Sequence, residues 1–127
     1  MNARSVVERR LQSFGFAFKG LIQLFRSQAN ARIHAFVALL VVAMGFFLGL
    51  PARDWAALVF AISLVLALEA VNTAIEALAD RVAPDAHPLV ARCKDAAAAA
   101  VLIAAAGAVV VGLLLLGPPL LAWLANP

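Results

Sequence analysis

The sequence predicts an all-α membrane protein of one domain, residues 1–127, in which an N-terminal amphipathic surface helix precedes three transmembrane helices. Hydrophobic residues make up 65% of the chain and the mean hydropathy is +1.00, whereas ordinary globular domains are about 45–50% apolar. Three apolar stretches are long enough to cross a bilayer, and the segment before them has apolar residues at helical spacing.

The surface helix is expected at about residues 5–26. Its apolar residues recur with a period of about 3.6 residues, and basic residues flank an aromatic face. This pattern is typical of a helix that lies in the plane of the membrane interface. The apolar positions are Val7, Leu11, Phe14, Phe18, Leu21, Ile22 and Phe25.

The first span is expected at about residues 33–50, with Arg32 and His34 at its start. A tight polar turn at residues 51–54 then leads into a second span at about residues 55–79. A hydrocarbon core of about 30 Å needs about 20 helical residues, so the end of the second helix reaches water.

Residues 80–95 are expected to form the one substantial polar loop. A third span follows at about residues 96–116, and Gly117, Pro118 and Pro119 are expected to end it. Small residues recur at every fourth position of this span, which predicts a smooth face for close helix packing. They are Ala96, Ala100, Ala104, Ala108 and Gly112.

The basic residues predict the orientation of the chain. Six of the ten Lys and Arg residues precede the first span and three lie in the loop at residues 80–95, so the N-terminus and this loop are expected in the cytoplasm. The net charge of +3 favours anionic headgroups and phosphate esters over nucleic acid, because the basic residues lie beside apolar spans. Cys93 is the single cysteine, which excludes an intrachain disulfide.

Four polar residues of the second span fall within roughly an 80° sector of one helix face. They are Glu69, Asn72, Glu76 and Asp80. Ionisable groups inside a span cost about 2.5–3.5 kcal/mol each and normally mark a functional site. Two other interpretations stay open: the stripe is polar glue between helices, or Glu69 carries protons in a small proton-coupled transporter.

Carboxylates beside a lysine at the cytoplasmic face suit a reaction between a water-soluble phosphate donor and a lipid hydroxyl. Glu76 is placed to ligate Mg²⁺, and Lys94 to neutralise phosphate. Glu69, deeper in the span, is the candidate base toward the hydroxyl. No Gly-rich Walker loop is present in the sequence.

These residues carry a resemblance to a known family. The motifs are Glu69-Ala-Val-Asn-Thr-Ala-Ile-Glu76, Asp80, His87-Pro88-Leu89, Lys94-Asp95 with the alanine run that follows, and Lys19-Gly20-Leu21. Together they closely resemble the bacterial diacylglycerol kinase and undecaprenol kinase family. The resemblance implies a homotrimer in the bacterial cytoplasmic membrane, with active sites shared between neighbouring subunits. It also implies Mg²⁺-dependent transfer of the ATP γ-phosphate to diacylglycerol or undecaprenol.

Carried over onto this sequence, the resemblance makes Glu69 the catalytic base and Glu76 a metal ligand. It places Asn72, Lys94 and Asp95 around the nucleotide phosphates, with Arg9, Asp85 and His87 as further candidates for nucleotide contact.

One position departs from the family pattern. The second metal-binding glutamate, expected just before the first span, is Gln28 here. An amide oxygen can ligate Mg²⁺ without bringing charge, so a raised Mg²⁺ requirement and an inactive family member are both open. Arg32 contacts the lipid substrate or snorkels to headgroups. The segment Arg32-Ile33-His34 looks more like the undecaprenol kinase branch than the enteric diacylglycerol kinase branch.

Overall fold

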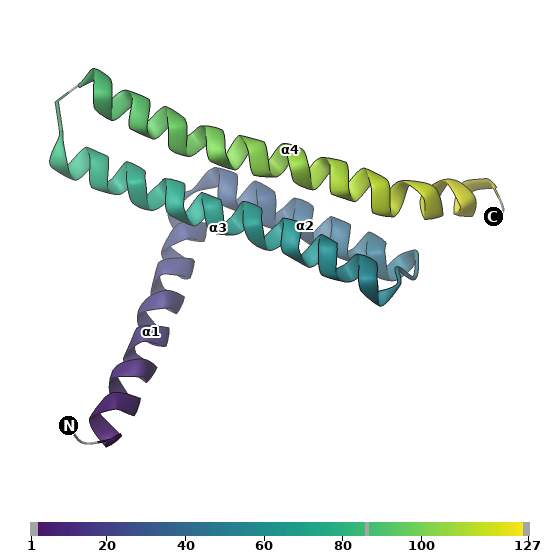
Figure 1. Ribbon diagram of the computed structural model, residues 1–127, viewed down its shortest axis with the longest axis horizontal. Helices are drawn as coiled ribbons and strands as arrows, with labels where there is room; N and C mark the ends of the chain where they lie inside the picture. The colour runs from purple at the N-terminus through teal and green to yellow at the C-terminus, as the bar shows by residue number, and fades with distance from the viewer. Residues whose placement is uncertain (1–2, 86, 126–127) are drawn as a thin grey trace.

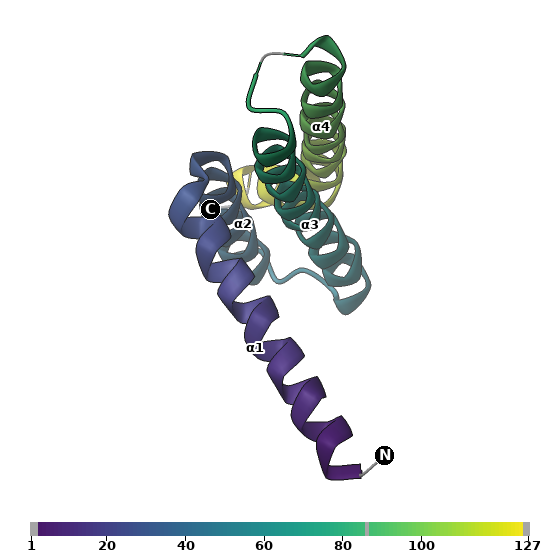
Figure 2. The same ribbon diagram turned by 90° about the vertical axis from the view of Figure 1, so that its left-hand side faces the viewer.

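The computed structural model describes residues 3–85 and 87–125, with side chains from residue 9 onward. Four helices make up this part of the chain: α1 (Ala3–Ser27), α2 (Ala29–Phe47), α3 (Ala52–Val82) and α4 (Pro88–Ala125). The described residues contain no strand. α2, α3 and α4 lie side by side as a bundle, and α1 leaves the bundle at a steep angle (Figures 1 and 2). The predicted all-α architecture is therefore confirmed.

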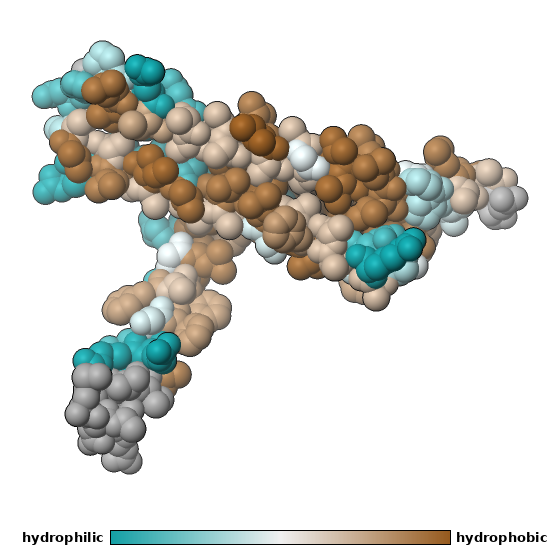
Figure 3. All heavy atoms as spheres, viewed as in Figure 1, coloured by the Kyte–Doolittle hydropathy of each residue, from teal (hydrophilic) through white to brown (hydrophobic). Residues whose placement is uncertain are grey.

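The outer faces of the bundle are apolar. α2, α3 and α4 are each long and apolar enough to cross a membrane. Large hydrophobic side chains such as Phe60, Leu102 and Ile103 are 70–73% exposed, and brown hydrophobic surface covers much of the bundle in Figure 3. A helix that is apolar on every side belongs in lipid or in the core of a large protein. The predicted class of membrane protein is confirmed.

The small core lies mainly between α3 and α4, which form the most extensive helix pair. Leu58, Ala61 and Val65 are buried on α3, and Val101 and Ala104 are buried on α4. These positions are three or four residues apart, the spacing with which two helices interlock side chains along a shallow crossing. A strict four-residue spacing drifts around the helix, and for this reason Ala96 of the predicted small-residue face is exposed.

The turn between α2 and α3 lies earlier than predicted, at residues 48–51. Gly49 has φ +66°, in the left-handed region that favours glycine. Its N–H donates to the carbonyl of Phe46 (3.2 Å), and the N–H of Leu50 donates to that of Gly45 (3.0 Å), which is a Schellman cap. The expected turn at residues 51–54 is wrong because this cap ends α2 at Phe47, and residues 52–54 form the first turn of α3.

The predicted polar loop at residues 80–95 is also mostly helical. Only residues 83–87 separate α3 from α4. Pro88 occupies the first position of α4, where its missing N–H costs nothing. The ring Nδ1 of His87 accepts a hydrogen bond from the N–H of Leu89 (3.2 Å) and so caps this helix end. The polar residues predict contact with water, but they do not distinguish a loop from a helix that extends beyond the lipid.

The predicted stop at Gly117, Pro118 and Pro119 is wrong, because α4 continues through both prolines to Ala125. Hydrocarbon offers the backbone no hydrogen bonds, so helix is favoured even where prolines remove two donors. The extension also packs: the rings of Trp123 and Phe47 meet edge to face with centroids 5.3 Å apart.

The helices differ in length, and this difference positions the polar residues. α2 has 19 residues and α3 has 31, which correspond to about 28 Å and about 46 Å. The α3–α4 turn therefore extends beyond the start of α2, as Figure 1 shows. The hydrophilic surface at that end of the bundle in Figure 3 belongs to this overhang.

Gly45 tests the packing of the α2–α3 turn. A Cβ added there would lie 2.9 Å from Trp55 Cη2, and Phe46 packs on the same indole with ring centroids 4.6 Å apart. We expect Gly45→Ala to lower the free energy of unfolding by about 1–3 kcal/mol relative to Gly107→Ala. The measurement is reversible unfolding in detergent micelles.

Gly107→Ala is the matched control, since a Cβ at Gly107 meets nothing within 4 Å. Both variants change glycine to alanine inside a helix, so helix propensity cancels in the difference. Equal stabilities of the two variants would contradict the tight packing of Trp55.

Candidate active site

One face of α3 changes from apolar to polar along its length. Leu58, Ala61 and Val65 are buried, and the next buried side chain on this face is the carboxylate of Glu69, only 3% exposed. Asn72, Glu76 and Asp80 continue the stripe at spacings of three and four residues toward the overhang. The face that packs the bundle at one end therefore carries the polar site at the other.

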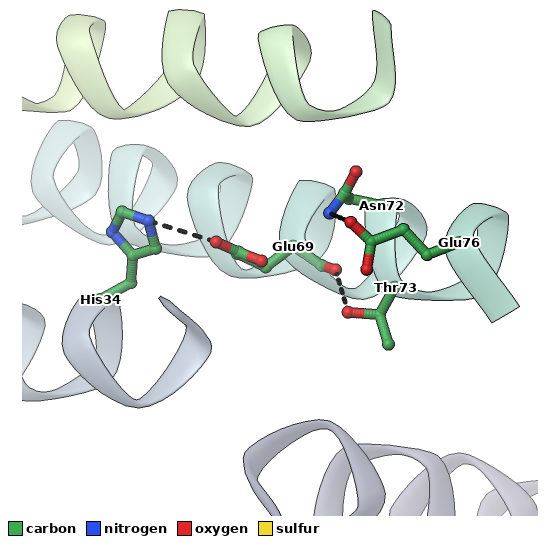
Figure 4. Close-up of polar contacts among 5 residues, drawn as sticks. All are labelled: His34, Glu69, Asn72, Thr73 and Glu76. Carbon is green, nitrogen blue, oxygen red and sulfur yellow. Dashed lines mark hydrogen bonds and ion pairs between the residues drawn. The ribbon is translucent and has the colours of Figure 1, made fainter. Parts of the chain in front are cut away.

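Glu69 is paired across the bundle with His34 of α2. The distance from His34 Nε2 to Glu69 Oε1 is 3.3 Å, and Figure 4 shows the imidazole pointing at this carboxylate. Among the described residues, Glu69 is the one buried charged or polar residue. A buried carboxylate is costly without a partner, so this contact is part of what allows Glu69 to sit there.

The sequence analysis placed His34 at the start of a span and missed this pairing. The hairpin register carries only part of this signal. In two antiparallel helices joined by a short turn, the numbers of level residues have a nearly constant sum. This sum is 99 for the helix ends at Phe47 and Ala52 and 103 for His34 and Glu69, so the turn places Glu69 within about one helical turn of the position level with His34.

A second polar pair lies further along α3. Asn72 Nδ2 donates to Glu76 Oε1 at 3.1 Å, and the hydroxyl of Thr73 donates to the backbone carbonyl of Glu69 at 2.9 Å (Figure 4). The other end of the Asn72 amide, Oδ1, is buried and has no hydrogen-bond partner within the part of the chain that the structure describes. A buried acceptor of this kind marks a place for a donor or a cation.

The third polar group lies at the α3–α4 turn. Lys94 Nζ is 2.9 Å from Asp80 Oδ1. These two side chains, with Asp85 and His87, line an open hollow of about 460 Å³. Lys94 and Asp80 are exposed to water, so their contact adds little to stability and leaves the ammonium accessible. The structure thus brings three of the predicted site residues, Asp85, His87 and Lys94, to one hollow.

The remaining candidates lie apart. Gln28 is the residue between α1 and α2. Arg32 donates to the carbonyls of Phe25 and Arg26, at 3.3 and 3.2 Å. This guanidinium therefore satisfies the last turn of α1.

Two further candidates are also outside the hollow. Asp95 is exposed next to Lys94. Arg9 lies in the N-terminal half of α1, the half that points away from the bundle in Figure 1.

The donor set at the α3 stripe is sparse for a metal ion. Among the described residues, no group of three or more His, Cys, Asp and Glu side chains converges on one point. Mg²⁺, however, is usually held by one or two carboxylates together with substrate phosphates and water. The Glu76 carboxylate and the unpaired Asn72 Oδ1 are hard oxygen donors that fit a cation held in this way.

Fold and site together define a class of protein. It is a small membrane enzyme that has a buried carboxylate and a polar hollow toward one end of a three-helix bundle. Residues 15–116 match the family described as prokaryotic diacylglycerol kinase. This match includes all three acids of the stripe, Gln28 and Lys94, and leaves out Arg9.

Individual relatives agree with the family match. The diacylglycerol kinase of Synechocystis sp. is 43% identical over 122 residues, covering 95% of this chain and 70% of that protein. The undecaprenol kinase of Bacillus subtilis is 35% identical over 94 residues, 74% of this chain and 76% of that protein. The diacylglycerol kinase of Escherichia coli K12 is 35% identical over 87 residues, 68% of this chain and 71% of that protein.

The chain therefore belongs to the prokaryotic diacylglycerol kinase family. It is a lipid kinase, a transferase of the membrane. The family resemblance expected from the motifs is confirmed, and the kinase interpretation is favoured over the proton-coupled transporter.

A substitution of Asn72 tests whether the polar stripe lowers the stability of the fold. Asn72→Leu removes a buried acceptor that has no partner, and such an acceptor costs about 1–3 kcal/mol. The lost bond to the half-buried Glu76 offsets part of this gain. We expect the variant to be as stable as the parent or up to about 1 kcal/mol more stable, by unfolding in micelles.

Val71→Leu is the control, since Val71 neighbours Asn72 on α3 and is exposed. A clear loss of stability specific to Asn72→Leu would mean that the amide serves the fold.

Proposed function

We propose that this protein transfers the γ-phosphoryl group of ATP to the hydroxyl of a membrane lipid alcohol, diacylglycerol or undecaprenol, in a reaction that requires Mg²⁺. The observation that carries the proposal is the division of one helix face. A buried carboxylate lies where the stripe packs among apolar helices, and a hollow with an accessible ammonium lies beyond it along α3.

Glu69 is the proposed base. The lipid hydroxyl oxygen forms a bond to the γ-phosphorus, the bond from that phosphorus to the bridging oxygen breaks, and ADP leaves. The hydroxyl proton passes to the Glu69 carboxylate. His34 contacts Oε1, so Oε2 is the oxygen left for the hydroxyl. General bases of this kind contribute about 10²–10⁴-fold to the rate.

The hollow at the α3–α4 turn is the proposed nucleotide site. Lys94 would attract the phosphates of ATP, and phosphoryl transfer depends mostly on positioning and charge neutralisation. Asp80 holds the ammonium in place at 2.9 Å. Asp85 and His87 also line the hollow, while Asn72, Asp95 and Arg9 stay predictions for nucleotide contact.

Glu76, the Oδ1 atom of Asn72 and Gln28 are the residues proposed to hold Mg²⁺, and the bound cation would neutralise charge on the transferred phosphoryl group. The helix lengths support Gln28 in this set. Counting from the His34–Glu69 contact, Gln28 lies about 9 Å back along α2, and Glu76 lies about 10 Å forward along α3. The two side chains are therefore nearly level.

The same geometry supports the membrane placement that we propose. If α1 lies on the cytoplasmic surface of the inner membrane, the corner at Gln28 marks the water boundary. Glu69 then sits at headgroup depth, and the α3–α4 overhang projects into the cytoplasm. This agrees with the excess of Lys and Arg in α1 and in the α3–α4 region.

A homotrimer with shared active sites is part of the proposal. The exposed apolar faces of α2, α3 and α4 exceed what a soluble monomer carries. Within one chain, the half of α1 that bears Arg9 points away from the bundle (Figure 1). A neighbouring copy offers a way to bring it to a site.

Relatives of this chain are named for both lipids. A direct assay is therefore needed to identify the lipid alcohol that this protein phosphorylates. Purified protein in mixed micelles is supplied with ATP, Mg²⁺ and either diacylglycerol or undecaprenol. We expect phosphorylation of one lipid with at least about tenfold preference. In Glu69→Gln we expect turnover to fall by about 10²–10⁴-fold, because the amide cannot take the proton.

Asp54→Asn, in the first turn of α3 and far from the stripe, serves as the control and should keep parental turnover. Absence of phosphorylation of either lipid over a full Mg²⁺ series would contradict the proposed function. ATP binding without turnover would identify an inactive family member.

Gln28 predicts an unusual metal requirement. Gln28→Glu adds a charged oxygen donor level with Glu76, so we expect the half-saturating Mg²⁺ concentration to fall about tenfold, equivalent to about 1.4 kcal/mol. The measurement is turnover against Mg²⁺ at saturating ATP. An unchanged Mg²⁺ curve would exclude Gln28 from the metal site.

A further inference from the structure

Among the residues that the structure describes, His34 is the one side chain paired with the carboxylate of the deeper acid, Glu69. We propose that His34 is a positioning residue, which holds the Glu69 carboxylate in the orientation that accepts the proton of the lipid hydroxyl. This inference rests on the proposed function of Glu69 as base, and it assigns to His34 a role in the reaction through that base.

The first argument is that the carboxylate has one side-chain contact. His34 Nε2 lies 3.3 Å from Glu69 Oε1. Thr73 bonds the backbone carbonyl of Glu69 and leaves its carboxylate untouched. Within residues 9–85 and 87–125, the structure shows no other hydrogen bond or ion pair to this carboxylate. One contact therefore sets the rotation of the group.

The second argument is that the two glutamates of the stripe are held independently. Glu76 accepts from Asn72 on its own helix, whereas Glu69 is held by a residue of another helix. Seven residues, or about 10 Å along α3, separate the acids. A change at His34 should therefore alter the base and leave the proposed cation ligands in place.

The third argument is that the imidazole itself is fixed. Its side chain is 27% exposed, and it lines an apolar cavity of about 90 Å³ between α2, α3 and α4. Val41, Leu58 and Ala105 are among the other residues of that cavity. Packing on the apolar side and the carboxylate on the other leave the ring little freedom.

The chemical consequence follows from geometry. A carboxylate in an apolar setting needs a hydrogen-bond donor to stay oriented. With Oε1 in contact with Nε2 of His34 at 3.3 Å, Oε2 can face the substrate. Misplacement of a reacting group by about 1 Å can cost about 10²-fold in rate.

The kinetic test compares two variants of His34. His34→Leu removes the donor while keeping an apolar side chain against the cavity, and we expect kcat to fall by about 10²-fold with the KM values for ATP and lipid within about twofold. His34→Gln can offer an amide N–H near the position of Nε2, so we expect it to recover to within about tenfold of the parent kcat.

Val41→Ala is the control, because Val41 lines the same cavity and lies two helical turns beyond His34, so it should keep the parental kcat. Equal losses in His34→Leu and His34→Gln, a loss in Val41→Ala as large as that in His34→Leu, or near-parental kcat in His34→Leu would each overturn the proposal.

A spectroscopic test separates this proposal from the proposed function. The chain has two histidines, His34 and His87. In protein carrying ¹⁵N-labelled histidine, a His87→Asn background leaves the ring resonances of His34 alone. We expect Glu69→Gln to move the Nε2 resonance of His34 and Glu76→Gln to leave it in place.

An unmoved Nε2 resonance in Glu69→Gln would show that the pair does not form, and would overturn the proposal whether or not the protein phosphorylates a lipid. A moved resonance in a parent protein that turns over no lipid would leave the pair intact and place the failure in the proposed function.

Discussion

The burial of Glu69 among apolar helices is the constraint on which the rest of the site depends. At 3% exposure, the carboxylate must find a partner from another part of the chain, because hydrocarbon supplies none. His34 meets this need only if α2 and α3 are in the right register. That register is set about 25 Å away, where the left-handed backbone of Gly49 closes the Schellman cap of α2. A glycine in a turn thereby fixes a contact in the site.

Because α2 is shorter than α3, the stripe on α3 lies in two chemical environments, one enclosed and one open. Next to α2, the α3 stripe is enclosed and carries the deeper acid. Beyond the start of α2, the same stripe opens toward water through Asp80 and Lys94. A lipid alcohol and a nucleotide need these two environments, since one substrate has its hydroxyl at headgroup depth and the other is hydrated. One continuous helix face joins them without a loop.

Composition and periodicity were sufficient to predict the helical architecture, the three spans and the acidic stripe, because lipid imposes helix and makes buried charge conspicuous. The details that failed depend on local backbone chemistry. The cap at Gly49 ends α2 before Pro51 is reached. The segment around Pro118 and Pro119 is rich in leucine, and α4 stays helical there, whereas prolines in a water-exposed segment would more readily end a helix. Charge density at residues 80–95 predicts contact with water, but it could not distinguish a loop from helices that extend into water.

His34 was missed for a different reason, since its partner lies 35 positions away and a periodic pattern within one helix carries no information about a neighbouring helix. The register of the hairpin supplies that information only to within about one helical turn. The proposed metal ligands raise the same issue. Gln28 and Glu76 come nearly level through the register of α2 and α3, the same register that pairs His34 with Glu69. One hairpin register thus places both the proposed base and the proposed cation ligands, which explains how a bundle with so small a core can hold a functional site.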